Sequence, residues 1–272
     1  MTATAIPRVV VCAGGLGTRV ASWTRYLPKE FYPVEGRPGL VHLLEEIAVL
    51  GPAEVTVVCH PYYERFTAWA RTAFSQDGHD RYIRAAQQPG PPAPAAALTL
   101  SFITQCGPYA DITSVLNGAS HFASGEDLYV AFADNLYPAS NPLLALRSVA
   151  PGCTAVLARP YQRTLAAGRG VIITRCDSGR LLMTGMAEKP APDAARELEH
   201  RYGPANLRLL EGRARLTADF VRFARAYQPP DGTEPKLALA LAAYARMHPV
   251  AIITTTSQVI DLGAAGAGSR AS

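Results

Sequence analysis

Apolar stretches and amphipathic stretches alternate along the first half of the chain. Short apolar runs rich in β-branched residues and bounded by turn residues are typical of buried strands, and we expect them at 9–13, 54–59, 98–104, 128–133 and 154–159. Apolar residues recur with helical spacing between these runs, which predicts helices at 40–50, 62–74, 113–122 and 142–149. Repeated strand–helix units predict an α/β fold with a mostly parallel, Rossmann-like sheet flanked by helices.

The pattern changes after Arg159, where strand signals outnumber helix signals. Strands are expected at 170–174, 181–187, 207–216 and 250–255, with a short extended piece at 258–260. Helices are expected at 193–200, 217–227 and 236–247. No obvious linker marks the change, so we predict a single domain over 1–272, with a core at 1–160 and a smaller strand-rich lobe at 161–272. The stretch 76–97, rich in Pro, Ala, Gly and Gln, is interpreted as a loop with at most a short helix at its start.

Composition narrows the class of protein. The chain has 272 residues, 49% of them hydrophobic and 18% charged, which is enough apolar material for a sizeable core. No apolar run reaches the roughly 18 residues of a membrane span, and no signal-peptide pattern precedes the first strand, so we expect a cytoplasmic protein that does not bind membranes. The net charge of +4 comes from scattered arginines without a basic stripe, which argues against nucleic-acid binding. The five cysteines form no CxxC pair, and reduced thiols are expected.

The stretch 14–19, with the sequence GGLGTR, is the strongest chemical signal in the chain. It directly follows the first expected strand, and its three glycines let the backbone approach a ligand closely. Free N–H groups in such a loop bind anions, while Arg19 and Lys29 add two spaced cations. This combination favours a polyphosphate ligand, although a glycine-rich turn alone is often only structural. The loop fits neither a Walker A motif nor the dinucleotide fingerprint G-x-G-x-x-G.

Other polar residues follow the expected strands. Gln105 and Asp134 come directly after two of them, and ligands of such sheets bind at the carboxyl ends of the strands. Glu188 and Lys189 offer a hydroxyl acceptor beside a phosphate-binding cation, and Asp261 stands near the end of the chain. Each of these residues taken alone has a simpler interpretation as a cap or a turn residue. Their joint occurrence in this order is what favours a site.

These motifs together resemble the sugar-phosphate nucleotidyltransferases. The resemblance is carried by GGLGTR at 14–19, PKE at 28–30, Gln105, Asp134, GVI at 170–172, EKP at 188–190 and IDLG at 260–263. Within this family, PKE and EKP look most like the UTP–glucose-1-phosphate uridylyltransferases, the bacterial UDP-glucose pyrophosphorylases, with the thymidylyltransferases as close relatives. The resemblance covers nearly the whole chain and implies the nucleotide-diphospho-sugar transferase fold, with the lobe at 161–272 binding the sugar phosphate.

The resemblance implies a role for each matching residue. Arg19, Lys29 and Lys189 would be catalytic cations, and Gly170 and Glu188 would bind sugar hydroxyls. Asp134 and Asp261 would hold Mg²⁺. The nucleotide would be bound by Ala13, Gly14, Gly15, Gly17, Thr18, Glu30 and Gln105. The reaction implied is attack of a sugar-1-phosphate on the α-phosphorus of an NTP, with UTP or dTTP and glucose-1-phosphate favoured, in nucleotide-sugar biosynthesis. The partners would be these two small substrates, and assembly into a homo-oligomer stays open.

The sequence departs from the family in three places. The family's G-L-G-H-A run after the glutamine, which closes over the base, is replaced by PYADITS at 108–114. A Gly-Asp-Asp triplet becomes ADN at 133–135, and an L-T-D-A-I segment becomes LALAL at 237–241. A changed substrate is therefore the simplest hypothesis. The alternatives are a non-catalytic homologue that binds a nucleotide or an NDP-sugar, and a cytidylyltransferase that acts on a non-sugar phosphate.

Overall fold

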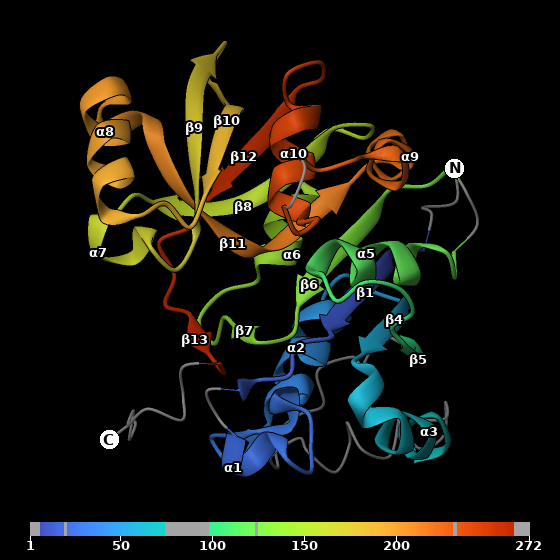
Figure 1. Ribbon diagram of the computed structural model, residues 1–272. Helices are drawn as coiled ribbons and strands as arrows, with labels where there is room; N and C mark the ends of the chain where they lie inside the picture. Colours follow the sequence, from blue (N-terminus) through green and yellow to red (C-terminus); the bar gives the residue numbers. More distant parts are fainter. Residues whose placement is uncertain (1–5, 19–20, 74–97, 123–124, 231–232, 264–272) are drawn as a thin grey trace.

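The computed structural model describes residues 6–18, 21–73, 98–122, 125–230 and 233–263 (Figure 1). Its strands are β1 (Arg8–Ala13), β2 (Pro33–Val34), β3 (Arg37–Pro38), β4 (Ala53–Cys59), β5 (Leu98–Thr104), β6 (Leu128–Phe132), β7 (Asn135–Leu136), β8 (Thr154–Pro160), β9 (Gly170–Asp177), β10 (Arg180–Glu188), β11 (Leu207–Leu216), β12 (Val250–Thr254) and β13 (Ile260–Asp261). Its α-helices are α1 (Ala21–Thr24), α2 (Gly39–Ala48), α3 (Glu64–Ala73), α5 (Asp111–Ala119), α6 (Pro142–Arg147), α7 (Arg163–Ala166), α8 (Pro192–Tyr202), α9 (Ala218–Ala226) and α10 (Leu237–Tyr244). Short 3₁₀ helices span Lys29–Phe31, Pro61–Tyr63 and Pro204–Asn206.

The longer strands form a nine-stranded sheet in the order β5-β4-β1-β6-β11-β8-β12-β10-β9. The first four strands pair in parallel, as expected for strand–helix units. The prediction of a mostly parallel sheet fails beyond β6, because β11 pairs antiparallel with both β6 and β8, and β10 pairs antiparallel with β12 and β9. The sheet is therefore mixed. The β9–β10 hairpin turns at Ser178 and Gly179, whose positive φ values of 49° and 78° suit a tight two-residue turn.

Helices cover both faces of this sheet and give three layers. The residues of β1 alternate between the layers, because Val9 and Val11 belong to one core cluster and Val10 to the other. The first cluster is completed by apolar residues of α2 and α6, and the second by those of α5, α9 and α10. A strand buried on both faces explains why its sequence is a continuous apolar run without alternation.

Most of the expected elements are confirmed, with ends that differ by a few residues. The expected helix at 62–74 begins with the 3₁₀ turn Pro61–Tyr63 and continues as α3. The expectation of a loop at 76–97 lies outside the described residues. Strands from both halves of the chain share the nine-stranded sheet, and the boundary at residue 160 stays a prediction. In the part of the chain that the structure describes, no helix is long and apolar enough to cross a membrane.

Candidate functional site

The glycine loop after β1 packs tightly against the segment that follows β5. A Cβ atom on Gly14 would press against Oε1 of Gln105 and would lie 2.7 Å from the hydroxyl of Ser114, so a larger residue here would have to displace these two side chains. Gln105 is itself fixed, because Ser114 donates to its Oε1 at 2.5 Å and its Nε2 donates to the carbonyl of Pro108 at 3.2 Å. The predicted nucleotide residues Gly14 and Gln105 are therefore neighbours in the fold.

Lys29 lies beneath the same loop. A Cβ atom on Gly15 would lie 3.1 Å from Cε of Lys29, and Gly17 adopts the left-handed φ of +60° that glycine favours. The ammonium of Lys29 forms an ion pair with the carboxylate of Asp134. Burial acts to lower the pKa of Lys29, but the attraction of Asp134, with Glu30 and Asp261, outweighs it, and the pKa is raised. The lysine is therefore a fixed positive charge next to the loop.

Glu30 occupies a position that the sequence does not reveal. Its side chain is 1% exposed, and neither of its carboxylate oxygens has a hydrogen-bond partner among the described residues. Oε1 lies 4.0 Å from Nζ of Lys29. Burial raises the pKa of Glu30 to about 8, although Lys29 pulls it down. The predicted contact of Glu30 with the nucleoside stays a prediction, and its place behind Lys29 gives it an additional electrostatic connection to that lysine.

Asp134 and Asp261 are brought together by a small two-stranded sheet. The strands β7 and β13 pair antiparallel, with Asn135 opposite Asp261 (Figure 1). The amide of Leu262 donates to the carbonyl of Asp134 at 2.8 Å, which ties the two segments together a second time. One oxygen of Asp261 accepts from the amide of Gly263 at 2.8 Å. Two residues far apart in the sequence therefore reach the same end of β6.

The donor set here fits Mg²⁺ chemically. Mg²⁺ binds through one or two carboxylates, substrate phosphates and several waters, and dedicated all-protein cages are unusual for it. Among the described residues no group of three or more His, Cys, Asp or Glu side chains could hold a metal ion, so the protein would supply only Asp134 and Asp261. The remaining ligands would have to come from substrate and water, as in phosphate-transferring enzymes.

The predicted sugar-side residues form a second group at the ends of β9 and β10. Gly170 stands opposite Glu188, and a Cβ atom on Gly170 would lie 3.2 Å from Oε2 of Glu188. Lys189 follows with a φ of +46°, an uncommon conformation for a residue other than glycine. Its amide donates to the carbonyl of Arg169 at 3.2 Å, and its Nζ lies 4.0 Å from Glu188. Strained backbone of this kind clusters at ligand-binding sites.

Two further predicted residues, Thr18 and Arg19, stand at the end of the glycine loop. Arg19 lies outside the described residues, and Thr18 is exposed at the end of the loop. Sequence reasoning missed Ser114, which holds Gln105, and Lys236, whose Nζ lies 3.4 Å from Glu188. It also missed Arg213, whose guanidinium is buried beside Asp134. The same strand also carries Arg208, Glu211 and Arg215, so its sequence alone does not single out Arg213.

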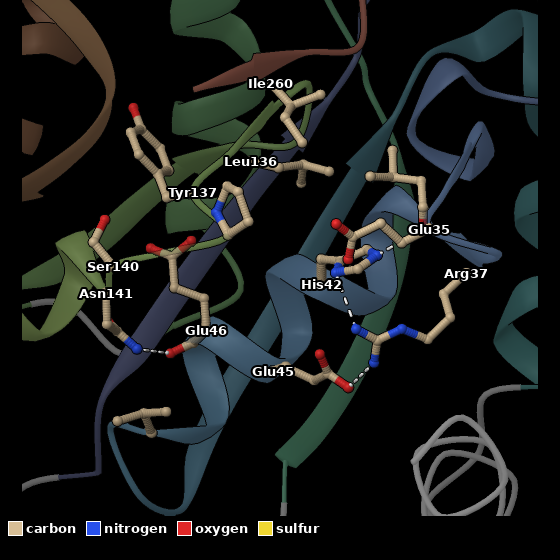
Figure 2. Close-up of a pocket in the computed structure, with 13 residues that line it drawn as sticks. Glu35, Arg37, His42, Glu45, Glu46, Leu136, Tyr137, Ser140, Asn141 and Ile260 are labelled. Atoms are coloured by element: carbon tan, nitrogen blue, oxygen red, sulfur yellow. Dashed lines mark hydrogen bonds and ion pairs between the residues drawn. The ribbon is translucent and has the colours of Figure 1, made fainter. Parts of the chain in front are cut away.

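A pocket of about 360 Å³ lies on the α2 side of β7 and β13 (Figure 2). One side is polar, where Arg37 pairs with Glu45 at 2.6 Å and contacts His42 at 3.2 Å. Leu136 and Ile260, from β7 and β13, line the pocket as well, and Figure 2 shows Tyr137 next to Glu46. The pocket does not include the glycine loop, Lys29 or Lys189, so it is separate from the predicted site.

Comparisons with known proteins agree with the class indicated by the motifs. The chain is 23% identical over 270 residues to the UTP–glucose-1-phosphate uridylyltransferase YngB of Bacillus subtilis, covering 95% of this chain and 85% of that protein. Its fold matches a UDP-glucose pyrophosphorylase solved with UDP-glucose, with a TM-score of 0.72, 19% identity and 96% of each chain covered. A UTP-bound enzyme from Acinetobacter baumannii matches with a TM-score of 0.69, 20% identity, and coverage of 95% of this chain and 89% of that one. No family model matches the chain.

The resemblance to the sugar-1-phosphate nucleotidyltransferases is thereby confirmed in sequence and in fold. Uridylyltransferases that use glucose-1-phosphate are among these relatives, and the prediction of an enzyme of the nucleotidyltransferase class agrees with them. The α/β fold of this chain, with its mixed sheet, is close to the folds of these solved structures.

Proposed function

We propose that this chain transfers a nucleoside monophosphate from an NTP to a sugar-1-phosphate, giving an NDP-sugar and pyrophosphate. UTP or dTTP and glucose-1-phosphate are the favoured substrates, because a uridylyltransferase that uses glucose-1-phosphate is among the sequence relatives. The observation that carries the proposal is the meeting of the glycine loop, Lys29 and two aspartates at the carboxyl end of β1 and β6. That edge is where ligands bind in sheets of this kind.

The reaction needs positioning and charge more than a base. A phosphate oxygen of the sugar-1-phosphate would attack the α-phosphorus, the bond to the β-phosphate oxygen would break, and pyrophosphate would leave with the electron pair. A phosphate dianion is already a nucleophile, so no proton has to be removed. Most of the acceleration would come from fixed cations that stabilise the spreading negative charge.

Different residues of the chain would contribute to different parts of this reaction. The loop Gly14–Thr18 would cradle the triphosphate with its backbone amides, with Gln105 held at the base side by Ser114. Lys29 would stabilise the charge on the reacting phosphates, and Lys189 would bind the sugar phosphate. Mg²⁺ held by Asp134 and Asp261 would supply further charge neutralisation when it is bound.

Little space separates the glycine loop from Gln105 in the proposed nucleotide site. A larger residue at position 14 would have to displace Gln105, because the loop lies directly on that side chain. The same closeness places a carboxamide, whose NH₂ group donates and whose oxygen accepts, beside the loop, and such a group can read the edge of a base. The segment Pro108–Ser114 contributes Ser114 and the carbonyl of Pro108 to this arrangement, so it supports Gln105 without the family's G-L-G-H-A run.

The proposal is tested by pyrophosphate release with MgCl₂, glucose-1-phosphate and each of UTP, dTTP, CTP, GTP and ATP. Release with UTP or dTTP that needs both substrates would support it. If none of the five nucleotides gives pyrophosphate release but a nucleotide raises the melting temperature, the result would favour a non-catalytic binding protein or another acceptor phosphate. The absence of any stabilisation would contradict the nucleotide site. Release with CTP and a non-sugar phosphate would favour the cytidylyltransferase alternative.

A further inference from the structure

Arg213 is the largest fully buried side chain of the described residues, with 1% of its surface exposed. It lies on β11 in the middle of the sheet, where a guanidinium is costly unless every donor is matched. The carboxylate of Glu46 on α2 accepts two hydrogen bonds from Arg213, one from Nε at 3.0 Å and one from Nη2 at 2.8 Å. This paired fork is the strongest geometry for an arginine and a carboxylate.

The other donors of Arg213 reach the backbone on both sides of Asp134. Nη1 donates to the carbonyl of Phe132 at 2.9 Å, and Nη2 donates to the carbonyl of Asn135 at 2.7 Å. The guanidinium also lies over the ring of Tyr137, 4.9 Å from its centre. One planar group therefore bridges the turn that carries Asp134, and Glu46 fixes the plane of that group.

The same cluster continues toward the second aspartate. The hydroxyl of Tyr137 donates to Oε2 of Glu211 at 2.9 Å, and the other oxygen of Glu211 pairs with Arg159 and, at 3.1 Å, with Arg169. Arg159 in turn donates to the carbonyl of Ser257 at 3.2 Å. Ser257 belongs to the segment that leads into β13, so the cluster contacts the segments that carry both aspartates.

We propose that Arg213, with Glu46, Tyr137 and Glu211, sets the spacing of the two aspartates and thereby tunes the affinity for the divalent cation. This inference rests on the proposed function, because it assumes that Asp134 and Asp261 hold Mg²⁺. Groups that orient metal ligands without touching the metal typically change metal affinity by about 10–100-fold when they are altered. These side chains act through Asp134 and Asp261 and are positioning residues.

The chain offers a matched control on the same strand. Arg215 is also buried, and it donates to the carbonyl of Val149 at 2.6 Å and to Asp127 at 2.8 Å, so its hydrogen bonds among the described residues do not reach the turn that carries Asp134. Arg213→Lys and Arg215→Lys both keep the positive charge and remove the guanidinium. A purely structural role would make the two variants behave alike, whereas positioning predicts that they differ.

The experiment measures the rise in melting temperature that MgCl₂ adds at saturating UTP, as a function of MgCl₂ concentration. We expect Arg213→Lys to raise the half-saturating concentration at least tenfold and Arg215→Lys to leave it unchanged. The stabilisation by UTP without MgCl₂ should be the same in both. Tyr137→Phe keeps the ring under Arg213, removes its bond to Glu211, and replaces Arg213→Lys if that variant does not fold.

The variant Asp134→Asn distinguishes a failure of this inference from a failure of the proposed function. If it abolishes the MgCl₂ effect while Arg213→Lys and Tyr137→Phe match Arg215→Lys, the positioning role is overturned and the proposed function stands. If the wild-type protein shows no MgCl₂ effect, or Asp134→Asn leaves that effect intact, both the metal site of the proposed function and this inference are wrong. A tenfold rise restricted to the Arg213 and Tyr137 variants supports the inference.

Discussion

The nucleotide side and the sugar side of the candidate site are built differently. Lys29 has 9% of its side chain exposed and is held by the glycine loop and Asp134, whereas 55% of the Lys189 side chain is exposed. Gln105 is buried and hydrogen-bonded, while Glu188 pairs with Lys236 at 3.4 Å and with Lys189 at 4.0 Å. Cations fixed before the reaction cost no reorganisation when charge develops. We therefore expect the nucleotide side to carry catalysis and the sugar side to adjust to its substrate.

The largest effect is expected from the centre of the nucleotide side. Lys29→Ala and Asp134→Ala should each lower kcat by about 10³-fold, because each removes a charge from the reacting phosphates or their metal. Pyrophosphate release measures this effect, and circular dichroism checks the fold. Arg222→Ala is the control, since Arg222 is exposed on α9 and pairs only with an exposed Asp219 among the described residues. Turnover close to wild type in either variant would contradict the proposed roles.

A smaller effect is expected from filling the glycine loop. Gly14→Ala would press a methyl group against Gln105 and Ser114, and overpacking of this kind costs about 1–3 kcal/mol. The KM for the nucleotide should rise by about tenfold while the KM for the sugar phosphate stays unchanged. Gly168→Ala is the matched control, because its nearest described contact would be a carbonyl at 3.7 Å. Equal kinetics in the two variants would show that the close approach is unimportant.

Lys189→Ala should act on the other substrate alone. The exposed ammonium is screened by water, so we expect a rise of about tenfold in the KM for the sugar phosphate and no change in the KM for the nucleotide. Arg196→Ala, on exposed α8, serves as a control for loss of one positive charge. If Lys189→Ala changed the KM for both substrates equally, the division into two sides would be wrong.

Substitution of Glu30 is expected to have the smallest effect on catalysis. It should have a clear effect on how stability depends on pH. The Glu30 pKa of about 8 in the fold lies above the value of about 4.5 for a free glutamate, so the folded state binds the extra proton and stability falls as the pH rises from about 5 through 8. Glu30→Gln resembles the protonated form and should match wild type near pH 5. Urea unfolding at pH 5, 7 and 9 should show a smaller decline in the variant. Parallel declines would mean that Glu30 is ionised throughout.

The contrast between the two sides also explains what the sequence could predict. The β1 run, the glycine loop and Lys29 are close in the chain, and their apolar pattern and turn residues specify them locally. The glycines predict close approach of the loop to a ligand, which stays a prediction, and the structure shows in addition that Gly14 lies close to Gln105. Asp134 and Asp261 were paired only through the family resemblance, because β7 and β13 are too short to show a pattern.

The rest depends on contacts between distant segments. The hydrophobic pattern of β11 predicts a strand but carries no information about its direction, so its antiparallel place between β6 and β8 was missed. In the sequence, Arg213 is one of several scattered arginines. Only the fold places it next to Glu46 and the carbonyls beside Asp134. Glu30 likewise gives no sign in the sequence that it is buried behind Lys29.

The most direct test follows the α-phosphate itself. UTP radiolabelled at the α-phosphate, mixed with glucose-1-phosphate, MgCl₂ and the protein, should yield a labelled NDP-sugar in step with released pyrophosphate. The same mixture with Lys29→Ala should leave the label in UTP. Label appearing in UMP, or no transfer to any sugar phosphate despite binding of UTP, would contradict the assignment of this site to nucleotidyl transfer.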